Sequence, residues 1–195
     1  MNTDFERHGI LARAVAFAAY AHDGQYRKCG KLPYILHPME AASIASVMTE
    51  DPEILAAAVL HDVIEDCGVT REELRREFGE RVAALVQSVT EPKDPDARGS
   101  WQRRKLHTVG KMREASTAQM ILMLSDKLSN LRSIERDMAV HGSDIWLFFH
   151  QSSPAMQYWY YASMGELLYP LKDYAPYQEY MERLNRVFPG HERGL

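Results

Sequence analysis

Apolar residues recur at three- and four-residue steps along most of this chain, which is the spacing of an amphipathic α-helix. Between residues 4 and 22, one such face carries Phe5, Leu11, Val15 and Ala18. No segment shows the sustained alternation of apolar and polar residues that marks a half-buried strand. The pattern predicts an all-α protein, a compact helical bundle of about eight to ten helices.

Helix start signals divide this pattern into elements. Pro38 stands at the tolerated first position of a helix expected over 37–49, and Asp51-Pro52 repeats the signal with an aspartate cap. Thr70 and Glu73 have the spacing of a capping box. Because the gaps between elements are short, we expect one domain over 1–195. Loops are expected at 23–36 and 91–100, and further helices at 70–79, 81–90, from residue 101, and at 117–136, 153–171 and 177–188.

Composition places the chain among ordinary globular proteins, with 46% hydrophobic and 26% charged residues in a length of 195. The formal net charge of −4 argues against broad binding to nucleic acid or to a membrane surface. No apolar run reaches the roughly 20 residues that span a bilayer, and the first residues lack the apolar segment of a secretion signal. Cys29 and Cys67 lack metal-binding spacing, so two free thiols in a reducing cytoplasm are expected.

The pair His61-Asp62 is the most informative feature, because it interrupts the apolar, helix-forming stretch 54–66. A buried carboxylate beside a buried imidazole is costly unless each has a partner, and a divalent cation is a partner for both. Asp126 lies within another apolar helical segment, and His37 lies at the start of a third. Such a mixed nitrogen and oxygen set suits Mn²⁺, Fe²⁺ or Zn²⁺ better than Ca²⁺. It would leave coordination positions open for water and substrate.

Each of these residues also has an ordinary structural interpretation. His37 alone could be a satisfied core histidine, and Asp126 alone could be a salt-bridge partner. Glu65, four positions after His61, and Asp66, four after Asp62, share the helix face of that pair, but they could equally form a solvated acidic helix end. The joint pattern favours a site, because several costly buried polar groups would otherwise need separate explanations.

Three segments of the chain resemble the signatures of HD-domain phosphohydrolases. They are His37-Pro38, the HDxxED pattern at 61–66, and the DKLSNLR segment at 126–132. Together with Gln25-Tyr26-Arg27-Lys28 and the PYILHP segment at 33–38, they resemble more narrowly the (p)ppGpp hydrolase domain of the RelA/SpoT family. The resemblance covers about 21–136. The chain contains no segment that resembles a synthetase region, and in this it is similar to the stand-alone, Mesh1-like small alarmone hydrolases.

The resemblance implies a metal site and a reaction. A bound Mn²⁺, with Fe²⁺ or Zn²⁺ as other possible ions, would be held by His37, His61, Asp62 and Asp126. The family removes pyrophosphate from the ribose 3′ position of ppGpp or pppGpp, which yields GDP or GTP. The family's Glu-Asp pair, which activates water, matches Glu65 and Asp66 here.

The resemblance also points Arg27, Lys28, Asn130 and Arg132 at a phosphorylated nucleotide. Considered alone, the charges of a polar loop such as Arg27 and Lys28 are usually solvated. The basic run 103–105 is expected to be a solvated face, with a phosphate-binding helix as the sharper alternative. The aromatic cluster 158–161 is expected to be mainly core packing.

Two other functions stay open on the sequence. One is an HD phosphohydrolase for another nucleotide: a nucleoside monophosphate, a cyclic nucleotide, an adenine alarmone or NADPH. The other is a catalytically silent nucleotide-binding protein on the same fold. The intact ligand set and the Glu65-Asp66 pair favour an enzyme. The expected partner is thus a small-molecule nucleotide, and the oligomeric state is not indicated.

Overall fold

The fold is helical, as the sequence predicts, and it is described here by a computed structural model over residues 9–91 and 100–190. Within these ranges the only extended pairing is an isolated bridge between Tyr26 and Pro33. None of the described helices is long and apolar enough to cross a membrane. The helices are α1 (Ile10–Ala21), α2 (Leu36–Ala45), α3 (Pro52–Leu60), α4 (Val63–Cys67), α5 (Arg71–Phe78), α6 (Glu80–Val89), α7 (Trp101–Met112), α8 (Thr117–His141), α9 (Pro154–Leu167) and α10 (Ala175–Val187), with the 3₁₀ segments η2 (Gly142–Phe148) and η3 (Tyr169–Leu171).

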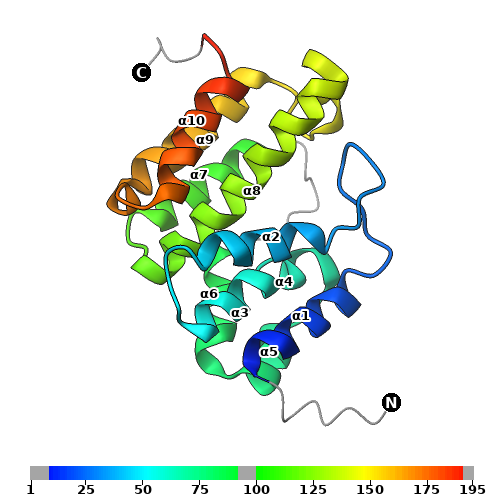
Figure 1. Ribbon diagram of the computed structural model, residues 1–195, viewed down its shortest axis with the longest axis vertical. Coiled ribbons are helices and arrows are strands. Elements are labelled where there is room, and N and C mark those ends of the chain that lie inside the picture. Colours follow the sequence, from blue (N-terminus) through cyan, green and yellow to red (C-terminus); the bar gives the residue numbers. More distant parts are fainter. Residues whose placement is uncertain (1–8, 92–99, 191–195) are drawn as a thin grey trace.

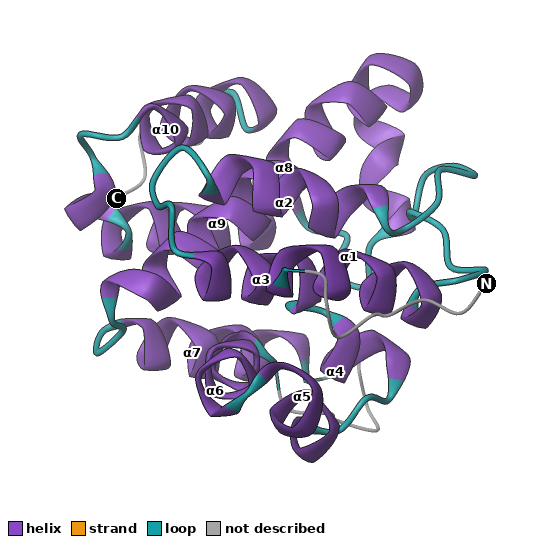
Figure 2. Ribbon diagram, turned by 60° about the horizontal axis from the view of Figure 1, so that its bottom comes forward, coloured by secondary structure: helices purple, strands orange, loops and turns teal. Residues whose placement is uncertain are grey.

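Two helices organise the bundle. The short apolar α3 packs against α1, α2 and α6, and the long α8 packs against α2 and α10 (Figure 1). From another side, α3 lies in the middle of the molecule, with α5 and α6 below it and α8 to α10 above it (Figure 2). Within α3 the run from Ala56 to Leu60 is almost completely buried, because small alanines let neighbouring helices approach closely. One contiguous core thus supports both halves of the chain.

The predicted start signals are present in the structure. Asp51 caps α3 by accepting a hydrogen bond from the Glu53 amide at 3.0 Å. Thr70 and Glu73 form a reciprocal capping box at the start of α5. Ser116 and Gln119 form another at the start of α8, which the sequence analysis did not single out. Such caps satisfy amides that the first helical turn leaves without partners.

The expectation of one helix through 54–66 is wrong at its centre. α3 ends at Leu60 and α4 begins at Val63, so His61 and Asp62 lie in the turn between them. The His61 imidazole bonds the Ala58 carbonyl oxygen at 2.8 Å, which gives this polar side chain a local backbone partner at the helix end. Because of this break, Asp62 and Glu65 do not lie on one continuous helix face.

Three other expectations differ in extent. The helix expected over 37–49 ends at Ala45. The helix expected over 117–136 continues to His141 and is followed by η2, because the apolar Ile145 and Trp146 bury themselves against the core. The helix expected over 153–171 ends at Leu167, and η3 replaces its last turn. The beginning of the first expected helix and most of the 91–100 loop lie outside the described residues.

Candidate metal centre and nucleotide pocket

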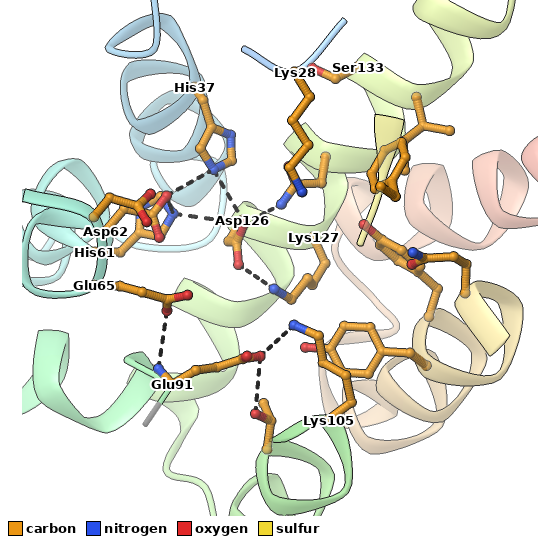
Figure 3. A pocket seen from close by; sticks show the side chains of 18 of the residues that line it. Lys28, His37, His61, Asp62, Glu65, Glu91, Lys105, Asp126, Lys127 and Ser133 are labelled. Carbon is orange, nitrogen blue, oxygen red and sulfur yellow. Dashed lines mark hydrogen bonds and ion pairs between the residues drawn. The ribbon is translucent and has the colours of Figure 1, made fainter. Parts of the chain in front are cut away.

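A pocket of about 600 Å³ lies where the α2, α3–α4 and α8 segments meet the α7 and α9 region. Nine of the ten predicted site residues line it, and Arg132 does not. Figure 3 shows His37, His61, Asp62 and Glu65 on one side and Lys28, Lys127 and Lys105 on the other. The pocket thus has one wall of imidazoles and carboxylates and one wall of cations. The predicted members that line it are Arg27, Lys28, His37, His61, Asp62, Glu65, Asp66, Asp126 and Asn130.

Three predicted metal ligands converge on the first wall. Ligand atoms of His37, His61 and Asp126 all lie within 4.8 Å of one another. The Asp126 Oδ1 atom is 3.4 Å from His37 Nε2 and 3.8 Å from His61 Nε2. Ligands held about 2.1 Å from one ion are separated by roughly 3.0 to 3.4 Å. The separations of Asp126 from the two imidazoles are therefore close to those of a site for a transition-metal ion.

Asp62 adjoins this group without belonging to its mutually close set. Its Oδ2 atom lies 3.0 Å from His61 Nε2 and 3.5 Å from His37 Nε2. The same oxygen accepts a hydrogen bond from the Tyr34 hydroxyl at 2.7 Å. Asp62 can therefore complete the ligand set from one edge, with its orientation fixed by Tyr34.

Two carboxylates meet on this wall, and Lys127 places an ammonium 2.7 Å from the Asp126 Oδ2 atom. His61 Nε2 is buried and makes no hydrogen bond within the described residues. Burial disfavours protonation of this imidazole, but the Asp62 and Asp126 carboxylates outweigh burial and raise its pKa to about 9. A divalent cation would neutralise the same carboxylates and would compete with the proton for the His61 imidazole. The donors therefore fit a divalent transition-metal ion, and two imidazoles with two carboxylates do not select among Mn²⁺, Fe²⁺ and Zn²⁺.

Glu65 and Asp66 lie one helical turn beyond the ligands, on α4. The Glu65 carboxylate accepts a hydrogen bond from the backbone amide of Glu91 at 3.2 Å. Burial and the neighbouring Asp62 carboxylate raise the pKa of Glu65 to about 7. The same two causes raise the pKa of Asp66. A carboxyl group with a pKa near neutrality is suited to accept and return a proton.

The cationic wall includes residues from three distant segments. Lys105 of α7 bonds Glu91 at 2.5 Å, and its ammonium lies 4.7 Å from the Tyr160 ring centroid. Burial and the nearby Lys127 lower the pKa of Lys105, although Glu91 opposes this shift. The pKa of Lys28 is lowered by desolvation and by the nearby Lys105, although its side chain reaches the surface. Cations that repel one another across a pocket favour an anionic ligand between them.

Arg27 holds the loop that precedes α2 against α8. Its guanidinium donates to the Asn130 side-chain oxygen at 2.9 Å and lies 5.6 Å from the Tyr34 ring centroid. Asn130 in turn donates to Asp126 at 2.5 Å. A predicted substrate residue is thereby connected, through two hydrogen bonds, to a predicted metal ligand. Asn130 thus lies on the same side of α8 as Asp126, and Arg27 lies beside it.

Arg132 is placed elsewhere, since residues 126 and 130 face the pocket and 132 lies about 200° around α8 from 130. Its guanidinium forms a two-bond ion pair with Glu179 of α10 at 2.8 and 2.7 Å, and a further bond to Glu40 at 3.1 Å. The side chain therefore points toward α2 and α10, away from the predicted substrate position.

Sequence reasoning missed several residues of this pocket. Glu91 is only 8% exposed and binds Arg104, Lys105 and Thr108. Because Glu91 directly precedes the proline-containing segment 92–95, the sequence predicts it to be part of a loop. Lys105 was indistinguishable from its basic neighbours, although Arg103 is exposed and lies outside the pocket. The aromatic cluster does pack in the core, as expected, yet Tyr160 and Tyr161 also line the pocket.

Comparison with known proteins agrees with this geometry. Residues 14–150 match the family model described as an HD domain, and the chain therefore belongs to the HD-domain family. Among curated proteins, the chain is 40% identical over 131 residues to guanosine-3′,5′-bis(diphosphate) 3′-pyrophosphohydrolase MESH1 of Danio rerio, covering 65% of this chain and 70% of that one. It is 34% identical over 134 residues to a guanosine-3′,5′-bis(diphosphate) 3′-pyrophosphohydrolase of Borreliella burgdorferi, covering 67% of this chain.

The relatives differ in length from this chain. The match spans 11% of the Vibrio cholerae protein of the same name and 20% of the Borreliella burgdorferi protein, so this chain corresponds to a small part of each. Among solved structures, a Listeria monocytogenes EGD-e protein, lmo0812, has a TM-score of 0.70 at 30% identity over 78% of this chain and 98% of its own. A structure titled as a metazoan ortholog of SpoT that hydrolyzes ppGpp has a TM-score of 0.70 at 24% identity, over 92% of this chain and 95% of its own, and supports the fold alone.

Proposed function

We propose that this protein hydrolyses the 3′-pyrophosphate of ppGpp and pppGpp, releasing pyrophosphate and GDP or GTP, with Mn²⁺ as the metal. The observation that carries the proposal is the arrangement of one pocket, in which a metal-ligand wall faces the cations Lys28 and Lys105. A pyrophosphate group needs both: a divalent cation on its oxygens and fixed positive charge around it. The names of the curated relatives support the choice of substrate.

The bound cation would supply Lewis acidity at a phosphoryl oxygen and would acidify a water molecule. His37, His61, Asp62 and Asp126 would hold it. Glu65 would accept a proton from the attacking water, since its carboxylate is positioned by the Glu91 amide and its pKa is about 7. In the reaction the bond between the ribose 3′ oxygen and its phosphorus breaks. The hydroxyl of water goes to that phosphorus, and Asp66 would help return the proton to the 3′ oxygen.

Lys105 and Lys28 would neutralise the departing pyrophosphate. Arg27 would contact the nucleoside or its 5′-phosphates, because its planar guanidinium can stack on a base and bind phosphate with two bonds. The Asn130 bond holds Arg27 at that position before substrate arrives. A site whose charges are arranged in advance lowers the reorganisation needed in the transition state.

The direct test is incubation of the purified protein with ppGpp and Mn²⁺, followed by separation of products. Equal amounts of GDP and pyrophosphate are expected, and Asp62→Ala is expected to abolish them. Turnover of a nucleoside monophosphate, a cyclic nucleotide, an adenine alarmone or NADPH in place of ppGpp would overturn the substrate assignment while keeping the hydrolase class.

A thermal titration separates an enzyme from a silent binding protein. Adding Mn²⁺ to the metal-free protein should raise the melting temperature, because an ion that binds only the native state stabilises it. At a metal concentration 100 times the dissociation constant, the stabilisation is about 2.7 kcal/mol. An unchanged melting temperature, with no turnover of any nucleotide, would contradict the enzymatic proposal.

A further inference from the structure

The two imidazoles of the metal wall are oriented by different means. His61 bonds the Ala58 carbonyl oxygen of its own segment through Nδ1, at 2.8 Å. His37 bonds the Ser129 hydroxyl through Nδ1, at 2.8 Å, across 92 residues of sequence. A backbone carbonyl cannot be removed by substitution, but a serine hydroxyl can. The orientation of His37 therefore depends on a particular side chain.

The hydroxyl of Ser129 has one proton, and the structure shows where it goes. Ser129 donates to the Glu40 carboxylate at 2.7 Å, and a carboxylate can only accept. Ser129 must then accept from His37, which places a hydrogen on His37 Nδ1. The lone pair of His37 is left on Nε2, the atom that lies 3.4 Å from Asp126 and 3.5 Å from Asp62. His37 and Ser129 are 4% and 1% exposed, so water does not compete for these bonds.

Glu40 is held in turn by Arg132. The guanidinium bonds the second oxygen of Glu40 at 3.1 Å and both oxygens of Glu179 at 2.8 and 2.7 Å. Arg183 also bonds Glu179, at 2.7 Å. Glu179 and Arg183 belong to α10, which lies beyond residue 150, where the family match ends. A chain of side chains thus leads from α10 to a metal-ligand imidazole.

We propose that Ser129, Glu40 and Arg132 form a positioning relay that fixes His37 as an Nε2 ligand, with Glu179 of α10 as its anchor. The proposal rests on the metal site of the proposed function, but not on the identity of the substrate. It reassigns Arg132 from nucleotide contact to support of the ligand set. Partners that orient a ligating histidine typically contribute about 10- to 100-fold to metal affinity.

The experiment compares substitutions at two serines one turn apart on α8. Ser129→Ala removes the relay, whereas Ser125→Ala removes an equally buried hydroxyl whose bond, among the described residues, is to the Ile121 carbonyl oxygen. Mn²⁺ and Zn²⁺ affinities are measured by competition with a chelator. We expect Ser129→Ala to weaken binding about 10- to 100-fold, Ser129→Thr to restore most of it, and Ser125→Ala to leave it unchanged. Equal effects of Ser129→Ala and Ser125→Ala would overturn the relay.

Glu40 supplies a second route if the threonine variant does not fold. Glu40→Gln keeps an acceptor for Ser129, and Glu40→Leu does not; because Glu40 is about one-third exposed, both should fold. Weaker metal binding in Glu40→Leu than in Glu40→Gln is expected. The same affinity in both would contradict the relay.

Arg132 is tested against Arg186, an α10 arginine that bonds Glu135 at 2.6 Å and, within the part of the chain that the structure describes, makes no bond to Ser129, Glu40 or Arg132. Arg132→Met should lower metal affinity and leave GDP binding to the metal-free protein unchanged, while Arg186→Met should alter neither. Loss of GDP binding with unchanged metal affinity would show Arg132 to be a nucleotide residue.

A further measurement separates this proposal from the proposed function. The ¹⁵N shifts of the His37 imidazole in the metal-free protein report which nitrogen holds hydrogen. A hydrogen on Nδ1 in the wild type, and a mixture of tautomers in Ser129→Ala, is the expected result. If the protein binds no metal yet gives this result, the metal assignment fails and the relay stands. A mixture already present in the wild type would overturn the relay.

Discussion

The Tyr34 hydroxyl donates a hydrogen bond of 2.7 Å to the Oδ2 atom of Asp62, and that oxygen also lies 3.0 Å from His61 Nε2. Tyr34 precedes α2 and Asp62 lies in the turn before α4, so the bond connects two segments that meet only in the folded protein. Burial and the Asp62 and Asp66 carboxylates raise the pKa of Tyr34, which keeps the hydroxyl protonated as a donor. One phenol thereby sets the direction of a predicted metal ligand.

Tyr34→Phe should therefore weaken metal binding about tenfold, because Asp62 loses the donor that orients it. The ring itself is kept, so its contact with the Arg27 guanidinium should persist. Chelator competition measures the effect. Tyr26→Phe is the matched control on the same loop, since Tyr26 is 59% exposed. Equal metal affinities for the two variants would refute the orienting role.

Glu65→Gln should separate chemistry from metal binding. The amide oxygen can still accept from the Glu91 amide, but the side chain can no longer take a proton from water. We expect kcat to fall about 10²- to 10⁴-fold, which is the usual contribution of a general base. Metal content should stay at the wild-type level, in contrast to Asp62→Ala, which should lose both. An empty metal site in Glu65→Gln would show that Glu65 is itself a ligand.

Lys105→Met should reduce kcat/KM for ppGpp about 10- to 100-fold, the equivalent of one lost charged hydrogen bond. Glu91 retains Arg104 at 2.9 Å and the Thr108 hydroxyl at 3.3 Å, so the fold should tolerate the change. Arg103→Met is the control, because Arg103 is exposed on the same helix outside the pocket. Steady-state kinetics give kcat/KM for both variants. A similar small decrease of kcat/KM in each would argue against a phosphate contact by Lys105.

Glu179 should make the free energy of unfolding depend on pH in the acidic range. The hydrogen bond from Arg132, assisted by that from Arg183, lowers the pKa of Glu179 to about 2, from an ordinary value of 4.5. A carboxylate with a lowered native pKa stabilises the fold fully above its unfolded pKa, and this contribution disappears as the pH falls toward the native pKa. Urea unfolding should therefore show wild type more stable than Glu179→Gln at pH 7, with the difference shrinking between about pH 4.5 and 2. A difference that is constant over that range would contradict the ion-pair account.

Several residues of the site can be predicted from the sequence because they are polar residues within apolar helical segments. An aspartate and a histidine in an apolar helical stretch must be explained by a partner, and the resemblance to HD-domain proteins supplied the set His37, His61, Asp62 and Asp126. Helical periodicity and caps gave the fold class for the same reason: they are local properties that short-range spacing records.

The remainder depends on contacts that spacing does not record. The turn at His61-Asp62 follows from a side-chain bond to Ala58, which competes with the helical pattern of the surrounding residues. The role of Glu91 follows from its approach to Glu65, 26 residues away, and to Lys105. Arg132 matched a family motif by position, yet Glu179, 47 residues further along the chain, provides its partner. Only the folded arrangement reveals these pairs.

The segment of α8 from Asp126 to Arg132 contributes residues to two faces of the helix. Asp126 and Asn130 line the pocket, while Ser129 and Arg132 bond residues of α2 and α10. Inserting or deleting one residue there would rotate everything beyond it by about 100°. Both faces would then lose their partners together, although many single substitutions would spare one of them. The spacing of these seven positions is therefore as necessary to the pocket and to the contacts with α2 and α10 as the side chains themselves.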